Sequence, residues 1–154
     1  MELKMKKILV MICLSLSLWA NSVYTKTFDK PMDEVYTKVL SSFKESKLIV
    51  VSEIDIMAKF KEAGLPKKFG EKFNTNKLDG IKAIIACNGW FGNEVANSDP
   101  EMMAFCPIRV TLVEQDGKTS VMYVRASVAP KDSKAHGVLQ KLEAKVISAI
   151  EAAL

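Results

Sequence analysis

Residues 107–129 read PIRVTLVEQDGKTSVMYVRASVA and predict a β-hairpin. The runs Pro107–Glu114 and Thr119–Ala129 are rich in β-branched and aromatic residues, which are common in strands. Between them, Gln115–Lys118 contains an aspartate followed by a glycine, a pair that is typical of tight hairpin turns. The hairpin therefore predicts one antiparallel pair of a sheet.

Upstream of the hairpin, strand patterns alternate with helix patterns. Strands are expected at Val23–Phe28, Leu48–Ile56 and Ile81–Cys87, where β-branched residues gather. A helix is expected from Pro31 to about Lys47, and a short one at Met57–Ala63. The first helix has one apolar face, formed by Met32, Val35, Tyr36, Val39, Leu40 and Phe43.

A second amphipathic helix is expected at the end of the chain, beginning near Asp132 or Ser133. Its apolar stripe consists of Val138, Leu139, Leu142, Val146, Ile150 and Leu154. The order of strands and helices predicts an α+β domain, with an antiparallel sheet and two main helices packed on one face.

Two segments look irregular. Asn88–Pro100 is polar and turn-rich, with a short helix expected around Asn93–Asn97. Gly64–Gly80 has turn residues at both ends and four lysines interleaved with Phe69 and Phe73. This segment could touch an acidic membrane surface, or it could be a solvated loop that packs its two rings.

The first 20 residues have the anatomy of an export signal: lysines, then an apolar stretch from Ile8 to Trp19, then the small residue Ala20. The stretch is shorter than the roughly 20 residues that a bilayer-spanning helix needs. We therefore expect cleavage after Ala20, a periplasmic protein without a stable membrane anchor, and a single domain over residues 21–154.

Charge argues against nucleic acid as a partner. Removal of residues 1–20 takes away three lysines and one glutamate, which lowers the formal net charge from +4 to +2. An exported domain of this charge, with no stripe of basic and aromatic residues, lacks the electrostatic footprint of a nucleic-acid binder.

Cys87 and Cys106 remain after cleavage, and an even number of cysteines in an oxidising compartment permits a disulfide. Alternation along the strands places Cys87 with Ile85 and Cys106 with Ile108, so both are expected on apolar faces. They could form a structural disulfide or remain buried, inert thiols. The alternative is a redox or sulfur-handling pair, or half of a metal or haem site.

Arg109 and Arg125 are the only arginines of the chain, and strand alternation groups them with Tyr123 on a polar face. Ordinary cross-strand charge pairs with Glu53 and Asp55 would explain them. Alternatively, this face binds an anionic ligand or a second subunit in a homodimer, because arginine contacts carboxylates and phosphates through two nitrogens at once.

No recognisable catalytic or metal-binding motif is present: the sequence has no phosphate loop, nucleophile elbow, dinucleotide glycine pattern or histidine–carboxylate pair. His136, the single histidine, is expected at the surface in the first turn of the last helix. Trp90 and Phe91 could floor a small pocket beside Asn88, or they could anchor their segment to the core. An enzyme is therefore the weaker hypothesis, and no metal or cofactor is assigned.

The chain resembles the domain of unknown function 302 family over about Phe28–Ala129. Two cysteine motifs carry the resemblance, Ile84–Asn88 at the end of one strand and Phe105–Pro107 at the start of the next, with Ser98–Glu101 between them. The resemblance implies a TATA-binding-protein-like arrangement, without implying DNA binding. We expect an exported, non-catalytic domain that binds a small ligand or a partner, with thiol redox or sulfur-relay chemistry at Cys87 and Cys106 as the alternative.

Overall fold

The structure is a computed structural model that describes residues 22–153. The expected export signal and its cleavage site lie outside the described residues. Within them, no helix is long and apolar enough to cross a membrane.

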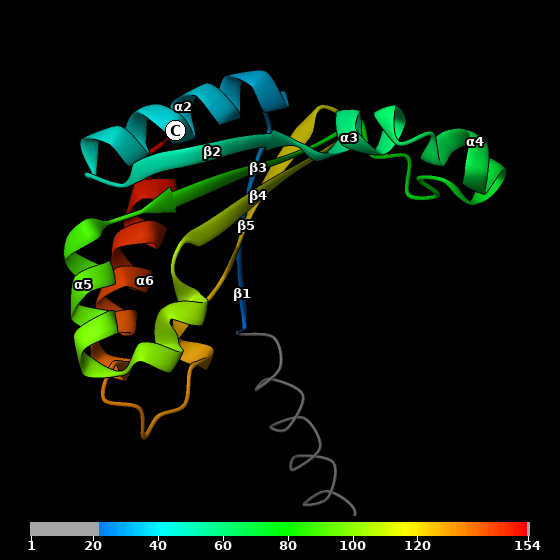
Figure 1. Ribbon diagram of the computed structural model, residues 1–154. Coiled ribbons are helices and arrows are strands. Elements are labelled where there is room, and N and C mark those ends of the chain that lie inside the picture. Colours follow the sequence, from blue (N-terminus) through cyan, green and yellow to red (C-terminus); the bar gives the residue numbers. More distant parts are fainter. Residues whose placement is uncertain (1–21, 154) are drawn as a thin grey trace, which may run out of the picture.

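The domain is built on one five-stranded sheet in the order β1-β5-β4-β3-β2, with every neighbouring pair antiparallel (Figure 1). The strands are β1 (Val23–Phe28), β2 (Ile49–Asp55), β3 (Gly80–Cys87), β4 (Ile108–Gln115) and β5 (Lys118–Val124). The α+β class and the antiparallel sheet predicted from the sequence are therefore confirmed.

The central hairpin has the predicted turn. Gln115 pairs with Lys118, which leaves Asp116 and Gly117 as a two-residue loop with φ angles of 52° and 72°. Aspartate and glycine tolerate this left-handed conformation, as a type I′ turn requires. β5 ends at Val124, sooner than expected, and a 3₁₀ turn at Ala126–Val128 follows it.

The long helices α2 (Met32–Glu45) and α6 (His136–Glu151) supply much of the main core. Val35, Val39 and Phe43 of α2 are fully buried, as are Val146 and Ile150 of α6. They pack with each other and with the even-numbered residues of β3 and β4, namely Ile84, Ala86, Ile108, Val110 and Leu112. Each fully buried side chain of this size contributes about 1.5–3 kcal/mol to folding.

The segment after β3 is more helical than its sequence suggests. The expected turn-rich stretch holds α5 (Gly89–Ser98), and a 3₁₀ helix, η2 (Pro100–Phe105), leads into β4. The side chain of Asn88 accepts a hydrogen bond from the Phe91 N–H and so caps the first turn of α5. A small apolar cluster between α5 and α6, centred on Val95 and Leu139, holds this end of the domain together.

At the other end, residues 56–79 form a lobe that projects from the sheet between β2 and β3 (Figure 1). It contains α3 (Ile56–Glu62), α4 (Leu65–Phe69) and the 3₁₀ turn η1 (Gly70–Lys72). The sequence predicted α3 but not α4. Gly64, at φ 70°, lets the chain reverse after α3, and Pro66 is accommodated in the first turn of α4, where its missing N–H costs nothing.

Candidate functional site

The sheet has one face toward the main core and one face away from it. We call the second the open face, and it carries the alternate residues, such as Ile85 of β3, Arg109 and Thr111 of β4, and Met122 and Val124 of β5. Val124 and Val23, at the neighbouring end of β1, are about half exposed, so this part of the face is apolar as well as accessible.

Arg109 lies on the open face, as its predicted role in ligand binding requires. Four cations lie within the five strands: Lys26, Lys82, Arg109 and Lys118. The three lysines each pair with a carboxylate at 2.9–3.2 Å, contributed by Glu151, Asp33 and Asp29 respectively. Within residues 22–153, Arg109 is the strand cation that makes no ion pair, and its guanidinium is accessible to an anion.

Two shallow hollows adjoin at Arg109, each about 230 Å³ in volume. They share Arg109, Tyr123 and Val124 as lining residues. One continues toward Phe105 and Pro107, and the other along β1, β4 and β5 to Val23, Thr111 and Met122. A charged group flanked by apolar surface can hold a small anion that carries an apolar portion.

Arg125 does not join Arg109, and the prediction that the two share a face is wrong. Its guanidinium donates to Oε1 of Glu143 on α6 at 2.9 Å and lies over the ring of Tyr24, on the core side of the sheet. The reason is the register of the hairpin. Because Gln115 pairs with Lys118, odd-numbered residues of β4 lie opposite even-numbered residues of β5, so the grouping of odd numbers across the turn was mistaken.

Tyr123 follows the same register. It pairs with Val110, is 4% exposed, and belongs to the main core rather than to a polar face. Burial raises the pKa of its phenol well above the usual range, and the nearby Glu143 carboxylate adds to the effect. Tyr123 is therefore neutral at ordinary pH. Its side chain belongs to the main core, and the residue borders both hollows.

Cys87 and Cys106 lie at the two ends of the α5–η2 segment, and both are half-buried free thiols. The two cysteines lie among apolar residues but on different faces of the sheet. Cys106 packs against the main core, whereas Cys87 shares the open face with Ile85. β3 and β4 are antiparallel neighbours whose last pair is Ala86 with Ile108, so the end of β3, at Cys87, lies beside the start of β4, which Cys106 precedes by two residues. Burial raises the pKa of the Cys106 thiol, and the nearby Cys87 raises it further.

Asn88, Trp90 and Phe91 form the start of α5. Both polar atoms of the Asn88 side-chain amide make hydrogen bonds: the oxygen caps α5, and the nitrogen donates to the Lys47 carbonyl at 2.9 Å. Phe91 packs against the main core, and Trp90 meets it edge to face with ring centroids 4.8 Å apart. Trp90 remains 58% exposed, so of the three it is the side chain that is free to contact a ligand or a partner.

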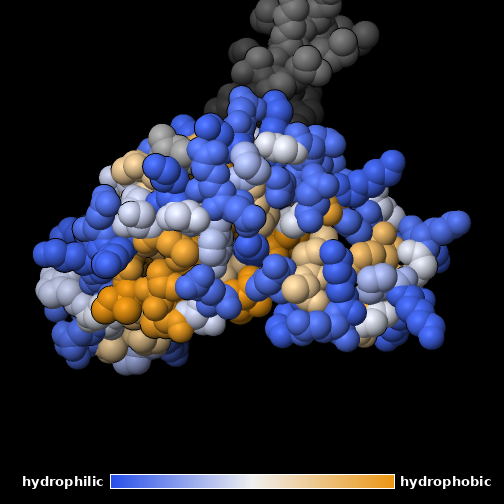
Figure 2. All heavy atoms as spheres, turned by 90° about the horizontal axis from the view of Figure 1, so that it is seen from above, coloured by the Kyte–Doolittle hydropathy of each residue, from blue (hydrophilic) through white to orange (hydrophobic). Residues whose placement is uncertain are grey.

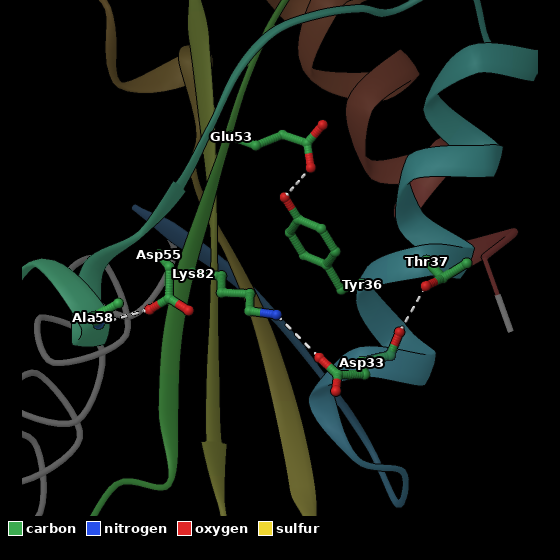
Figure 3. A network of polar contacts seen from close by, with 7 residues as sticks. All are labelled: Asp33, Tyr36, Thr37, Glu53, Asp55, Ala58 and Lys82. Atoms are coloured by element: carbon green, nitrogen blue, oxygen red, sulfur yellow. Dashed lines mark hydrogen bonds and ion pairs between the residues drawn. The ribbon is translucent and has the colours of Figure 1, made fainter.

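The acidic residues of β2 do not pair with the arginines. Figure 3 shows instead that Glu53 accepts a hydrogen bond from the Tyr36 hydroxyl at 2.5 Å and that Asp55 caps α3 through the Ala58 N–H at 2.8 Å. Lys82 of β3 reaches Asp33 of α2 in the same view. These contacts join β2, β3 and α2 and fix the direction in which the lobe leaves the sheet.

His136 begins α6 but is not a freely exposed histidine. It is half-buried, and its Nδ1 is buried without a hydrogen-bond partner among the described residues. No cluster of three histidine, cysteine, aspartate or glutamate side chains in residues 22–153 is arranged to hold a metal ion.

One cavity was missed by sequence reasoning. It lies in the lobe, measures about 370 Å³, and is lined by Phe60, Phe69 and Phe73 together with Lys72. The signal for it in the sequence is the interleaving of phenylalanines and lysines in Gly64–Gly80, a pattern that also fits a membrane contact or a loop that packs its own rings.

Comparison with known proteins agrees with this architecture. A model of the family described as "Domain of unknown function DUF302" matches residues 24–153. The chain is similar to the crystal structure of an uncharacterized conserved DUF302 protein from Bacillus stearothermophilus, with a TM-score of 0.74 and 16% sequence identity over 87% of this chain and 99% of that one. At this identity the likeness concerns the fold alone. No match was found among curated proteins.

Proposed function

The chain belongs to the DUF302 family, and we propose that it is an exported, non-catalytic domain that binds a small anionic ligand on the open face of its sheet, at Arg109. A fold alone does not specify a function, so the proposal rests on this chain's own residues. The observation that carries it is an accessible arginine without a carboxylate partner, flanked by two adjoining hollows and by the apolar side chains of Val23 and Val124.

The chemistry of arginine supports this choice. A guanidinium offers a planar set of N–H donors that matches the two oxygens of a carboxylate or phosphate. The hollows are small, so the ligand is small as well, and its apolar portion would lie against Val23, Met122 and Val124.

The experiment is a titration of ¹⁵N-labelled mature protein with benzoate and with inorganic phosphate, followed by amide chemical shifts. We expect shifts centred on β4 and β5 near Arg109 and their loss in Arg109→Gln. The matched control is Lys26→Met, which removes a sheet cation on the other face. Equal weakening by both variants, or shifts confined to the lobe, would contradict the proposal.

A thiol-based function is the second candidate, favoured by the proximity of Cys87 and Cys106. In such a reaction the two thiols form one disulfide while an external disulfide accepts the two electrons and two protons and leaves as two thiols. Counting free thiols in exported protein before and after mild reductant tests it. A count of two in both samples speaks against a disulfide in the exported protein.

Location, arrangement and partners are proposed on the following grounds. The sequence of residues 1–20 supports export to the periplasm with cleavage before Asn21, and an intact mass of the exported protein tests this. The antiparallel sheet with α2 and α6 against one face supports a TATA-binding-protein-like arrangement. The exposed edge of β2 supports a homodimer.

A further inference from the structure

The lobe formed by residues 56–79 is held at both ends, so its cavity is preformed. Asp55 caps α3 where the chain enters the lobe (Figure 3). Where the chain returns, Asn74 closes a loop through two hydrogen bonds of 2.9 Å to Leu78, and the side chain of Gln115 donates to the Asn76 carbonyl at 2.7 Å. A cavity bounded by elements tied in this way needs little ordering when a ligand binds.

The cavity has the size and lining of a small-molecule site. Its volume of about 370 Å³ lies within the range of roughly 300–1,000 Å³ that is usual for ligand pockets. Met57 and Ile81 line it where α3 meets β3, and Phe60, Phe69 and Phe73 line it from the lobe. Phe60 and Phe69 remain 37% and 49% exposed. Figure 2 shows apolar atoms of the lobe lying among hydrophilic ones at its surface.

These rings converge on one hollow, and this convergence distinguishes them from isolated surface hydrophobic residues. Single exposed apolar side chains are normal, whereas several that line one concave surface mark a binding site. Two helices of seven and five residues are too short to cover the rings themselves. An apolar ligand body in the hollow would remove them from water.

The charge of the lobe selects an anion. Lys72 is the one charged side chain among the lining residues and has no ion pair among the described residues. Residues 56–79 carry six lysines against Glu62, Glu71 and Asp79, so the lobe is more positive than the mature chain as a whole. A positive surface beside an apolar hollow favours a ligand that combines an apolar body with one negative group.

We propose that the lobe cavity is a second, independent site that binds a small amphipathic carboxylate. Its hydrocarbon body lies among the three phenylalanines, and its carboxylate pairs with the ammonium group of Lys72. The long apolar stem of a lysine lets its charge reach the carboxylate at the mouth while the stem contacts the hydrocarbon.

The test is calorimetric titration of the mature protein with decanoate and with decanol, both below the concentrations at which they aggregate. Lys72→Met should weaken decanoate binding about tenfold, because it removes a charge-assisted contact, and should leave decanol binding unchanged. The matched control is Lys67→Met, which removes an exposed lysine of α4 that does not line the cavity and should change either affinity less than twofold.

A second variant tests the apolar part of the site. Phe60→Ala keeps a good helix former in α3 and should weaken decanoate and decanol alike. Amide chemical shifts of ¹⁵N-labelled protein should place decanoate at the residues that line the lobe cavity, which separates this site from the one at Arg109. Absence of decanoate binding to the wild type, or equal losses in Lys72→Met and Lys67→Met, would overturn the proposal. Binding to phosphatidylglycerol vesicles without binding of decanoate would overturn it in favour of a membrane contact.

Discussion

Arg125 and Glu143 form an ion pair that joins the end of β5 to α6, with 2.9 Å between the guanidinium nitrogen and Oε1. The other carboxylate oxygen accepts a hydrogen bond of 2.7 Å from the Ser127 N–H. The two side chains are 28% and 11% exposed, respectively. Because both charges are largely withdrawn from water and pair with each other, Arg125 joins β5 to α6 and is not available to a ligand.

Replacement of the two arginines should therefore have unequal effects. Arg125→Leu should lower the free energy of unfolding by about 2–4 kcal/mol, because it leaves the Glu143 charge without its partner. Arg109→Leu should change it by less than about 0.5 kcal/mol, as surface substitutions usually do. Urea denaturation of both variants and the wild type measures the difference. Similar losses in both would contradict the assignment of Arg109 to the open face.

The same pair predicts a pH dependence. Burial of Glu143 alone would raise the pKa of its carboxyl, but hydrogen bonds from Ser127 and the contact with Arg125 outweigh burial and lower it. A group whose pKa is lower in the folded state stabilises the protein above its unfolded pKa, which is about 4.3 for glutamate, and this stability is lost as the pH falls through the folded pKa. The difference in unfolding free energy between the wild type and Glu143→Gln should thus be largest near neutral pH and shrink in acid. A difference that grows toward low pH would show the opposite shift.

The sequence predicted the elements best where the side-chain pattern is local. β1 matches its predicted bounds, and α2 and β2 differ from theirs by one or two residues. The open-face grouping failed because alternation was followed within each strand without the register that the two-residue turn imposes between strands. That turn was visible in Asp116 and Gly117, so the correct faces of Arg125 and Tyr123 could have been derived from it.

Other features depend on contacts between distant segments. α4 and α5 begin beside glycine, proline and asparagine, which are typical of turns. What identifies α5 as a helix is the Asn88 cap and the packing of Phe91 and Val95, and neither is visible in the sequence. The lobe cavity depends on contact between Ile81 of β3 and the rings of Phe60, Phe69 and Phe73, which lie earlier in the chain. The hydrophobic periodicity of the sequence does not predict contacts between separate segments of this kind.

Asn88 offers a test of a residue that sequence reasoning assigned to ligand binding. Asn88→Ala should cost about 1–2 kcal/mol, because it removes the cap of α5 as well as the hydrogen bond to the Lys47 carbonyl. Asn88→Asp keeps the cap but loses the donor, so its loss should be smaller. Thermal unfolding of the two variants measures both effects. An unchanged melting temperature in Asn88→Ala would show that the side chain is free for another role.

The Cys106 thiol should react more slowly than a free cysteine. Because burial and the nearby Cys87 raise the pKa of Cys106, little thiolate forms there at neutral pH, and the thiolate is the reactive species. Burial is the larger cause and remains in Cys87→Ser, so alkylation of Cys106 by iodoacetamide in that variant should be slower than that of a free thiol, and its rate should rise only above the ordinary cysteine pKa of about 8.5. Rapid alkylation at neutral pH would identify an activated thiol and favour the redox function.

β2 is an edge strand whose outer side bears an apolar patch. Ile49 and Val51 are 63% and 57% exposed, and Figure 2 shows the patch at the end of the molecule where α2 gives way to β2. An accessible apolar edge can pair with the same edge of a second copy, although the register irregularity between Val50 and Ser52 limits the length of such a pairing.

We expect the wild type to form dimers at high concentration and Val51→Lys to shift it toward monomer, because a lysine on the edge opposes its own copy across the two-fold axis and must leave the apolar contact. The control is Val128→Lys, at a valine outside the sheet that is 48% exposed, and it should leave the association unchanged. Sedimentation velocity over a range of concentrations measures both. If the wild type stays monomeric throughout, or if both lysine variants dissociate it equally, then β2 is not the dimer contact.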